Sequence, residues 1–344
     1  HPLPTVRAAV RLLLALLLLA LLGLSGAARA APVSRVDSIG ITVGDMERAL
    51  AFYTGVLPFE VISETEVHGD AYERLFGVFG MRARIVRLRL GDEEIELIDY
   101  LAPEGRPVPP DSRSNDEWFQ HVAMIVSDMD AAYARLRQHN VQHASTGPQR
   151  LPDWNPNAGG IEAFYFKNPD GNHLEILEFP PDKGDRRWHE PTDALFLGID
   201  HTAIVVRDTD ASVGFFEDAL GLQVRGTSEN YGPEQERLNN VFGARLLITS
   251  LGAPAGPAVE FLDYVAPATG RPMPIDTRAN DLWHWQIRME TADLQELEKT
   301  LRAAGAAFVS PGIVEMPDDA LALGRALMVR DPVGHAVLLM ERPH

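Results

Sequence analysis

The chain repeats itself, and this repetition limits its possible folds more than any other feature of the sequence. The pattern ERL-x-x-VFG at residues 73–80 returns at 236–243, a spacing of 163 residues (236 − 73). The pattern D-x-R-x-N-D-x-W at 111–118 returns at 276–283, a spacing of 165 (276 − 111). Because matches at a nearly fixed spacing mark an internal repeat, we predict a tandem duplication of two similar halves.

Each half divides again into two units that open with a strand and a helix. In the clearest case, the run from Ile199 to Val206 is rich in β-branched residues, which favours a buried strand. Asp208 then offers an N-cap oxygen, and Val213 and Phe216 recur on one face of a helix. The same order begins again near residues 36, 119 and 285.

Further strand-like runs, separated by tight turns, follow each helix. These runs are Arg82–Leu90, Glu94–Tyr100, Ala163–Lys167, His173–Phe179, Arg245–Leu251, Ala258–Tyr264, Ala326–Arg330 and Ala336–Met340. Each unit is therefore predicted to have the order βαβββ, which makes the fold class α+β. We number the four units as modules 1 to 4, at 36–101, 118–179, 198–266 and 283–341. Two domains are predicted, at 36–180 and 197–342.

The first 30 residues are typical of a signal peptide. Arg7 and Arg11 precede an apolar run at 12–24, and Ala28-Arg29-Ala30 matches an A-x-A cleavage site. We therefore predict an exported protein, periplasmic or secreted, with no stable membrane partner after cleavage. The alternative is an uncleaved N-terminal membrane anchor.

The amino-acid composition restricts the kinds of molecule that the protein is expected to bind. The formal net charge is −18, and lysine and arginine form no cluster beyond short pairs, so nucleic-acid binding is disfavoured. The chain has no cysteine, which excludes disulfides, thiolate metal sites and cysteine nucleophiles. Common hydrolase, nucleotide-binding and zincin motifs are also missing. A small-molecule substrate is the expected partner, and the oligomeric state is not predicted.

The module order resembles the vicinal oxygen chelate superfamily, which includes glyoxalase I, bleomycin-resistance proteins and extradiol dioxygenases. The resemblance covers residues 36–341. It implies that two βαβββ units form one half-barrel sheet around a divalent metal ion, of which nickel, cobalt, zinc, manganese and iron are the candidates. An isolated module leaves one sheet face bare, so pairing is also expected on physical grounds.

The resemblance places metal ligands on the first and last strands of the paired units. The first-strand positions are Ser38, His121, His201 and Gln286, and the last-strand positions are Glu96, Glu175, Glu260 and Leu338. Serine at the first of these positions and leucine at the last leave each half of the chain short of one ligand.

The pairing of the modules decides what these losses mean. If module 1 pairs with 2 and module 3 with 4, both sites are incomplete. If module 2 pairs with 3 and module 1 with 4, one site collects His121, Glu175, His201 and Glu260, and both losses fall on the other. Two imidazoles and two carboxylates suit a divalent cation with two open positions. We favour the crossed pairing, because tandem glyoxalases pair in this way.

Each candidate ligand also has a structural explanation. A single histidine in a strand is more often a core or surface residue than a ligand. A glutamate among apolar strand residues is costly unless it is paired or binds a metal, although it can also face solvent. His284 is an alternative ligand for the second site. His173, two residues before Glu175, either supports a ligand or only flanks the turn. The loop 146–160, with Trp154, is either a cover for a cavity or an ordinary surface loop.

For function, the resemblance implies a glyoxalase I-like lyase or isomerase that moves a proton on a substrate chelated through vicinal oxygens. Glu175 is the first candidate base and Glu260 the second. One alternative is an extradiol-type dioxygenase, whose carboxylate ligand is expected at the position of Leu338. The other is a non-catalytic protein that sequesters a small molecule, like the bleomycin-resistance members.

Overall fold

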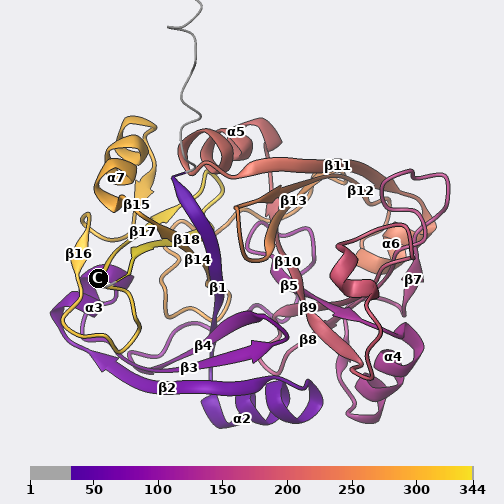
Figure 1. Ribbon diagram of the computed structural model, residues 1–344, viewed down its shortest axis with the longest axis horizontal. Coiled ribbons are helices and arrows are strands. Elements are labelled where there is room, and N and C mark those ends of the chain that lie inside the picture. The colour runs from indigo at the N-terminus through magenta and orange to yellow at the C-terminus, as the bar shows by residue number, and fades with distance from the viewer. Residues whose placement is uncertain (1–31, 343–344) are drawn as a thin grey trace, which may run out of the picture. The chain divides into compact units, whose positions relative to one another are not determined.

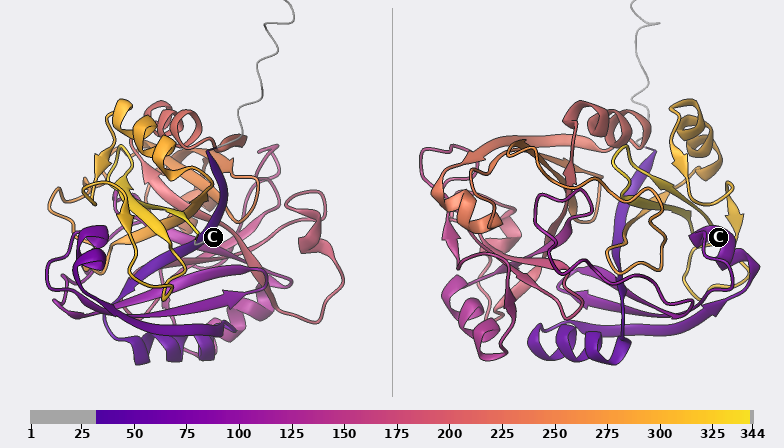
Figure 2. Two further views of the ribbon diagram at one scale, coloured as in Figure 1. Left: turned by 60° about the vertical axis from the view of Figure 1, so that its left-hand side comes forward. Right: turned by 180° about the vertical axis from the view of Figure 1, so that it is seen from behind.

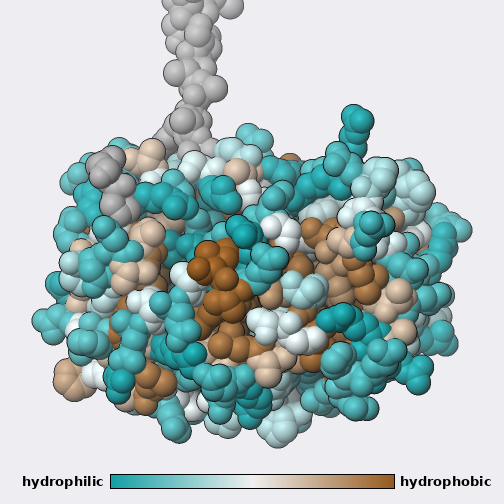
Figure 3. Space-filling model, turned by 60° about the horizontal axis from the view of Figure 1, so that its bottom comes forward, coloured by the Kyte–Doolittle hydropathy of each residue, from teal (hydrophilic) through white to brown (hydrophobic). Residues whose placement is uncertain are grey.

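The computed structural model describes residues 32–342, so the predicted signal peptide lies outside the described residues. Within this range the fold is α+β, as predicted, and is built from the four expected modules. No helix among residues 32–342 is long and apolar enough to cross a membrane. The surface in Figure 3 is largely hydrophilic, with apolar side chains gathered near the middle of that face.

Modules 1 and 3 have the same order of elements. Module 1 contains β1 (Val33–Val43), α2 (Met46–Leu50), the π-helical turn η1 (Ala51–Val56), β2 (Glu60–His68), α3 (Asp70–Phe76), β3 (Arg82–Leu90) and β4 (Glu93–Ala102). Module 3 contains β10 (Phe196–Val206), α5 (Thr209–Val213), the π-helical turn η3 (Gly214–Ala219), β11 (Gln223–Tyr231), α6 (Pro233–Asn239), β12 (Arg245–Gly252) and β13 (Ala258–Ala266).

Modules 2 and 4 are shorter versions of the same order. Module 2 contains β5 (Gln120–Val126), α4 (Met129–Gln138), β6 (Gln142–His143), β7 (Gln149–Arg150), β8 (Glu162–Lys167) and β9 (His173–Glu178). The 3₁₀ helix η2 (Arg186–His189) lies in the segment between the halves. Module 4 contains β14 (Trp285–Thr291), α7 (Leu294–Ala303), β15 (Ala307–Phe308), β16 (Val314–Glu315), β17 (Arg325–Arg330) and β18 (Ala336–Glu341).

The modules pair across the halves, as in the favoured prediction. Sheet A joins modules 4 and 1 in the order β15-β17-β18-β14-β1-β4-β3-β2, with β16 beside β17. Sheet B joins modules 3 and 2 in the order β11-β12-β13-β10-β5-β9-β8-β6, with β7 beside β8. In Figure 1 the yellow strands of module 4 accordingly lie beside the indigo strands of module 1. The view from behind in Figure 2 shows the same division.

The predicted helix starts are correct because the same cap forms four times. Each first helix begins after an aspartate whose carboxylate accepts a hydrogen bond from a backbone N–H of the first turn. These caps are Asp45, Asp128, Asp208 and Asp293. The repeated local signal therefore produces a repeated local structure.

Two arginine clasps hold the paired modules together at the repeated D-x-R-x-N-D-x-W segments. Arg106, which follows module 1, donates to Asp281 and Asp276 in the segment before module 4. Its guanidinium also lies over the ring of Trp283, 4.7 Å from the centroid. The two segments of the chain approach so closely that a Cβ on Gly105 would lie 1.6 Å from the carbonyl oxygen of Asn280. This clasp belongs to sheet A.

The second clasp repeats this arrangement for sheet B. Arg271 follows module 3 and donates to Asp116 and Asp111, which lie before module 2. It lies over Trp118, also 4.7 Å from the centroid. A Cβ on Gly270 would again collide with backbone, here the carbonyl oxygen of residue 115 at 1.7 Å. The second repeat found in the sequence is therefore the structural element that joins modules from opposite halves.

The core follows the alternation of side chains along the strands. One large apolar cluster combines the outer faces of both sheets with the helices that cover them, and includes Ile39, Ile41, Val122 and Met124. The intervening residues of each strand face the inside of the half-barrel, which we call its lumen. Candidate ligands at residues 38, 121 and 201 lie on these lumen faces.

Candidate metal centre

Four strands of sheet B bring the predicted ligand residues to one place. His121 lies on β5, Glu175 on β9, His201 on β10 and Glu260 on β13, and these strands are neighbours in the sheet. The registers align them: Ala203 of β10 lies opposite both His121 and Glu260. All four side chains therefore project into the lumen of sheet B.

The donor atoms are close enough to share one ion. Oε2 of Glu175 lies 3.0 Å from Nε2 of His121 and 3.6 Å from Nε2 of His201. Oε2 of Glu260 lies 3.4 Å from the same nitrogen of His201. Ligand atoms about 2.0–2.2 Å from a common divalent ion are separated by such distances. In the described residues, His121, Glu175 and His201 form one group of mutually close ligand atoms, and Glu260 borders it.

A buried polar atom without a hydrogen-bond partner also indicates that the cluster fits a metal ion. Nδ1 of His121 is buried and has no hydrogen-bond partner among the described residues, and its Nε2 faces the Glu175 carboxylate. Unpaired buried polar atoms are unusual and costly, and a nitrogen beside a carboxylate oxygen is a normal place for a cation. Two imidazole nitrogens and two carboxylates are borderline and hard donors that suit first-row divalent ions.

Asp200 is the residue that orients His201. Its Oδ2 lies 2.9 Å from Nδ1 of His201, and its Oδ1 accepts a hydrogen bond of 3.0 Å from Nε1 of Trp188. A β-bulge between Ile199 and His201 interrupts the alternation of β10, so two consecutive side chains can meet. With Nδ1 fixed in this way, Nε2 of His201 is directed toward the carboxylates of Glu175 and Glu260.

The charges of the cluster favour a cation at its centre. Burial would raise the pKa of the Glu175 carboxyl, but the neighbouring His121 and His201 outweigh it and lower the pKa to about 2. Burial lowers the pKa of His121. Burial also tends to lower the pKa of His201, but the negative charges of Glu260 and Asp200 help to raise that pKa well above the ordinary value. Positive charge is therefore stabilised here.

The four residues form the floor of a cavity of about 350 Å³. Its lining includes apolar side chains such as Leu177, Phe179 and Ile248, together with several amides and hydroxyls. Residues 151, 157 and 158 of the loop 146–160 line it as well, so the loop borders the cavity. Asn157 ties the loop to β11 by donating to the carbonyl oxygen of Thr227 at 2.6 Å. The volume suits a small ligand.

Sheet A carries the corresponding positions in the same arrangement of strands. Its registers match those of sheet B, because Gly40 lies opposite both Gln286 and Glu96. Leu338 lies opposite Arg288, as Glu175 lies opposite Ala123 in sheet B. Among residues 32–342, no group of three close ligand atoms from histidine, aspartate or glutamate includes Glu96.

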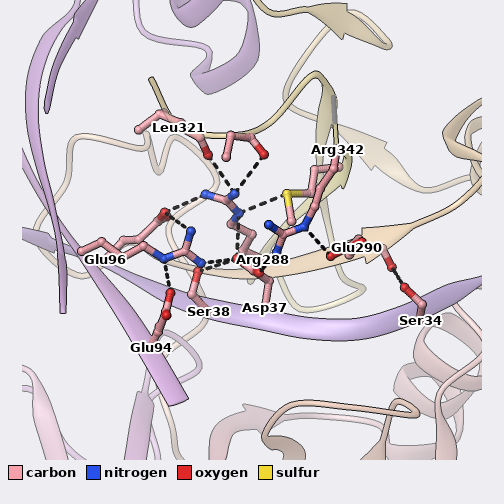
Figure 4. Close-up of polar contacts among 12 residues, drawn as sticks. Ser34, Asp37, Ser38, Glu94, Glu96, Arg288, Glu290, Leu321 and Arg342 are labelled. Atoms are coloured by element: carbon pink, nitrogen blue, oxygen red, sulfur yellow. Dashed lines mark hydrogen bonds and ion pairs between the residues drawn. The ribbon is translucent and has the colours of Figure 1, made fainter. Parts of the chain in front are cut away.

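A buried guanidinium occupies the lumen of sheet A instead (Figure 4). Arg288 is 1% exposed, and its Nη1 lies 2.7 Å from Oε1 of Glu96. Its Nε lies 3.1 Å from Oδ2 of Asp37, and its Nη2 donates to the carbonyl oxygen of Leu321. Apolar side chains such as Met340 fill the space around it. Arginine thus supplies the positive charge that balances Glu96.

Two further arginines complete this ion-pair cluster. Arg87 pairs with Asp37 and Glu94, and Arg342 lies 2.7 Å from Oδ1 of Asp37 (Figure 4). Burial opposes the charge of Asp37, but Arg288, Arg87 and Arg342 outweigh it and lower the pKa of its carboxyl. The cluster is a structural feature that sequence reasoning missed.

The two other histidines considered from the sequence do not join either centre. His173 packs against Phe119, with 4.8 Å between ring centroids, and burial lowers its pKa to about 3. Burial likewise lowers the pKa of His284 to about 3. Its Nε2 has no hydrogen-bond partner among the described residues, and it belongs to no group of close ligand atoms there.

Comparison with known families agrees with this architecture. A family model described as the Glyoxalase/Bleomycin resistance protein/Dioxygenase superfamily matches residues 35–176 and again 198–339. The chain belongs to this superfamily. The resemblance noted in the sequence is thereby confirmed. Characterised members of the glyoxalase/bleomycin resistance/dioxygenase superfamily are mostly enzymes that act on small molecules, and they usually bind a divalent metal ion.

Individual members of the superfamily resemble this chain to different degrees. A 2-epi-5-epi-valiolone epimerase from Actinomyces sp is 34% identical over 149 residues, covering 42% of this chain and 79% of the epimerase. A catechol-2,3-dioxygenase from Bacillus subtilis (strain 168) is 24% identical over 208 residues, or 54% of this chain and 64% of the dioxygenase. Glyoxalase I from Zea mays shares the fold, with a TM-score of 0.59, 14% identity, and coverage of 89% and 92% of the two chains.

Proposed function

We propose that this protein is a divalent-metal-dependent epimerase or isomerase that moves a proton at a carbon beside a carbonyl group. Its substrate binds through two adjacent oxygens. The observation that carries the proposal is the convergence of His121, Glu175, His201 and Glu260 on the floor of one cavity. The similarity to a 2-epi-5-epi-valiolone epimerase, at 34% identity, supports this reaction class.

The metal-binding role of these four residues is part of the proposal. An ion held by two imidazoles and two carboxylates would keep two positions open and supply Lewis acidity to the substrate oxygens. His201 is held for this role by Asp200. Burial of His121, Glu175 and His201 strengthens the electrostatic interactions of the site.

The two glutamates differ in their access to a substrate. The Glu175 side chain is 5% exposed and lies between both imidazoles, whereas the Glu260 side chain is 21% exposed and borders the cavity. We therefore assign Glu260 as the group that removes the proton, with Glu175 as the second candidate. As the proton passes to Glu260, the carbon–hydrogen electron pair forms a carbon–carbon double bond, and the π pair of the carbonyl group moves to its oxygen. Return of the proton to the other face, or to the neighbouring carbon, completes epimerisation or isomerisation.

Ring cleavage by an extradiol-type dioxygenase is the second candidate function. The similarity to a catechol-2,3-dioxygenase favours it, as do two histidines beside a carboxylate. However, the carboxylate position expected from the resemblance is Leu338, which lies in sheet A and not in the candidate centre. A third candidate, metal-free sequestration of a small molecule, would need the cavity but not the four converging ligands.

Metal analysis and isotope exchange separate these candidates. The purified protein is loaded with nickel, cobalt, zinc or manganese, and a hydroxylated ketone is incubated with it in deuterated buffer. We expect the hydrogen beside the carbonyl to exchange for deuterium, and exchange to fall in Glu260→Gln. Tightly bound iron with oxygen consumption on a catechol would instead support the dioxygenase. Binding of the small molecule in the cavity by protein that holds no metal would support sequestration.

Export from the cytoplasm remains a proposal based on the sequence. It is supported by the basic, apolar and A-x-A segments within residues 1–30. Cell fractionation, with N-terminal sequencing of the mature protein, tests it. A mature chain that begins close to residue 31 in the periplasm or the medium is the expected result, whereas retention of residues 1–30 in the membrane fraction would support the anchor.

A further inference from the structure

The charged side chains around the cavity above the candidate centre are mainly acidic. Among the described residues that line it, none is lysine or arginine, while Asp200, Glu175 and Glu260 contribute three carboxylates. One divalent ion would offset two of these charges and leave no positive excess for a second anion. A phosphate or carboxylate group on the substrate would therefore enter the site without a partner, at a large electrostatic cost.

Neutral hydrogen-bonding groups also line the same cavity. These are Asn157, Thr227, Ser228, Asn230, Gln235 and Ser250. Most come from the polar edge strand β11 and from α6, which follows it. Amides and hydroxyls at fixed positions recognise hydroxyl groups rather than charges.

Gln235 is the member of this set that most clearly needs a ligand. It is 2% exposed, and its Nε2 donates to Oδ1 of Asn239 at 2.5 Å. Its Oε1 is buried and has no hydrogen-bond partner among the described residues. Turning the amide over would exchange the two atoms but still leave one of them unpaired. A buried acceptor of this kind costs about 1–3 kcal/mol unless a donor reaches it.

The corresponding residue in module 1 shows that this unpaired hydrogen-bond acceptor has no counterpart at the matching position of sheet A. The repeat offset of 163 aligns Gln235 with Tyr72 (235 − 163 = 72), which lies on α3. Tyr72 is buried in the apolar cluster that fills the lumen of sheet A, and its hydroxyl donates to Asp318 at 2.7 Å. A satisfied, space-filling side chain in one lumen is thus replaced by an unsatisfied amide beside a cavity in the other.

We infer that the substrate is an uncharged aldehyde or ketone with several hydroxyl groups, and that Gln235 accepts a hydrogen bond from one of them. This inference rests on the proposed function, because it assumes that the carbonyl end of the substrate lies at the His121, Glu175, His201 and Glu260 cluster. The hydroxyls farther from the carbonyl then meet the neutral polar groups of the cavity. Gln235 acts as a specificity-determining residue.

Calorimetric binding tests this inference without using catalysis. The probes are a pentahydroxycyclohexanone and the same ring carrying one phosphate ester, each titrated into the metal-loaded protein. We expect the neutral ring to bind at least about tenfold more tightly than its phosphate ester, and Gln235→Leu to weaken neutral binding about tenfold, which corresponds to 1.4 kcal/mol. Gln235→Glu, which keeps an acceptor, should retain more affinity for the neutral ring than Gln235→Leu.

The control is Gln142→Leu, the same substitution at an exposed glutamine on β6 outside the cavity. Thermal unfolding of each variant confirms that it is folded. Equal or tighter binding of the phosphate ester, no binding of the neutral ring, or unchanged affinity in folded Gln235→Leu would each overturn the inference. Neutral binding that depends on Gln235 without deuterium exchange would instead overturn the proposed reaction and leave the substrate class standing.

Discussion

Asp200 and Trp188 meet through a 3.0 Å hydrogen bond, which connects the segment between the two halves to the candidate metal centre. The other carboxylate oxygen of Asp200 holds His201. Trp188 is in turn covered by the guanidinium of Arg187, 3.8 Å from the centroid of the ring, and Arg187 lies 2.6 Å from Glu93 on β4. A continuous series of contacts therefore runs from β4 of sheet A to a proposed ligand in sheet B.

Replacing Asp200 by asparagine is expected to lower metal affinity by about 10–100-fold, because outer partners of metal-bound histidines have effects of this size. The substitution keeps the shape of the side chain but weakens its hold on Nδ1 of His201. Competition with a chelator of known affinity measures the change. Asp185→Asn is the matched control, because this aspartate lies in the same segment as Trp188 and caps η2. Equal losses in both variants would contradict a specific role for Asp200.

One divalent ion is expected per chain, although the fold contains two half-barrels. Glu175→Gln should reduce the bound metal well below one equivalent, because it removes the ligand that lies nearest to both imidazoles. Glu96→Gln, in sheet A, should leave the stoichiometry unchanged. Elemental analysis after removal of metal by a chelator and reloading gives the count. Two equivalents in the unaltered protein would contradict the assignment of sheet A as a metal-free half.

The ion-pair cluster of sheet A predicts a specific pH dependence of stability. The pKa of Asp37 is lower in the folded protein than its ordinary value of 3.8, so its ion pairs stabilise the fold above that value. This contribution is lost as the pH falls through the lowered folded pKa. Asp37→Asn leaves buried Arg288 with one partner fewer, and should lower the free energy of unfolding by about 3–5 kcal/mol at pH 7.

The difference between the Asp37→Asn variant and the unaltered protein should shrink as the pH is lowered below about 4, because the unfolded chain then binds a proton at Asp37 while the folded protein still resists it. Urea unfolding followed at several pH values measures it. Glu94→Gln, which removes a more exposed partner of Arg87, should have a smaller effect. A difference that does not change with pH would show that shape, rather than charge, causes the loss.

The two arginine clasps should have separable effects. Arg271→Ala leaves the carboxylate of Asp116 buried without its partner, and Arg106→Ala does the same to Asp281, at a cost of about 1–3 kcal/mol each. Only the Arg271 clasp joins the modules of sheet B. We therefore expect both variants to unfold more easily, but metal affinity to fall only in Arg271→Ala. Chelator competition on both variants provides the comparison, and an equal fall in Arg106→Ala would contradict it.

Much of the fold was predictable because its signals are local and occur four times. The aspartate caps and the apolar strand runs located the first helix of each module and most buried strands within a few residues. Strands β2 and β11 were not located individually, because both are edge strands whose residues are mainly exposed and polar. The pairing of modules could not be derived from local patterns and was chosen through the resemblance to tandem glyoxalases.

The candidate site was predictable only in part, for a physical reason. His121, Glu175, His201 and Glu260 occupy matching positions, and the strand registers bring them together. Asp200 and Asp37 escaped notice because a bulge breaks the alternation that assigns side chains to faces. Arg288 was missed because it stands at the position of Ala123 in the other sheet, where the duplication offers no charged counterpart.

Crossed pairing has a further consequence for how the two lumens can differ. Two separate half-length chains with one sequence would associate through a twofold axis, and every change in one lumen would appear in the other. Because the halves are joined in one polypeptide, each lumen can accept substitutions independently. The arginine in sheet A and the open cavity in sheet B are a pair of specialised outcomes that a symmetric dimer of identical subunits has no means of producing.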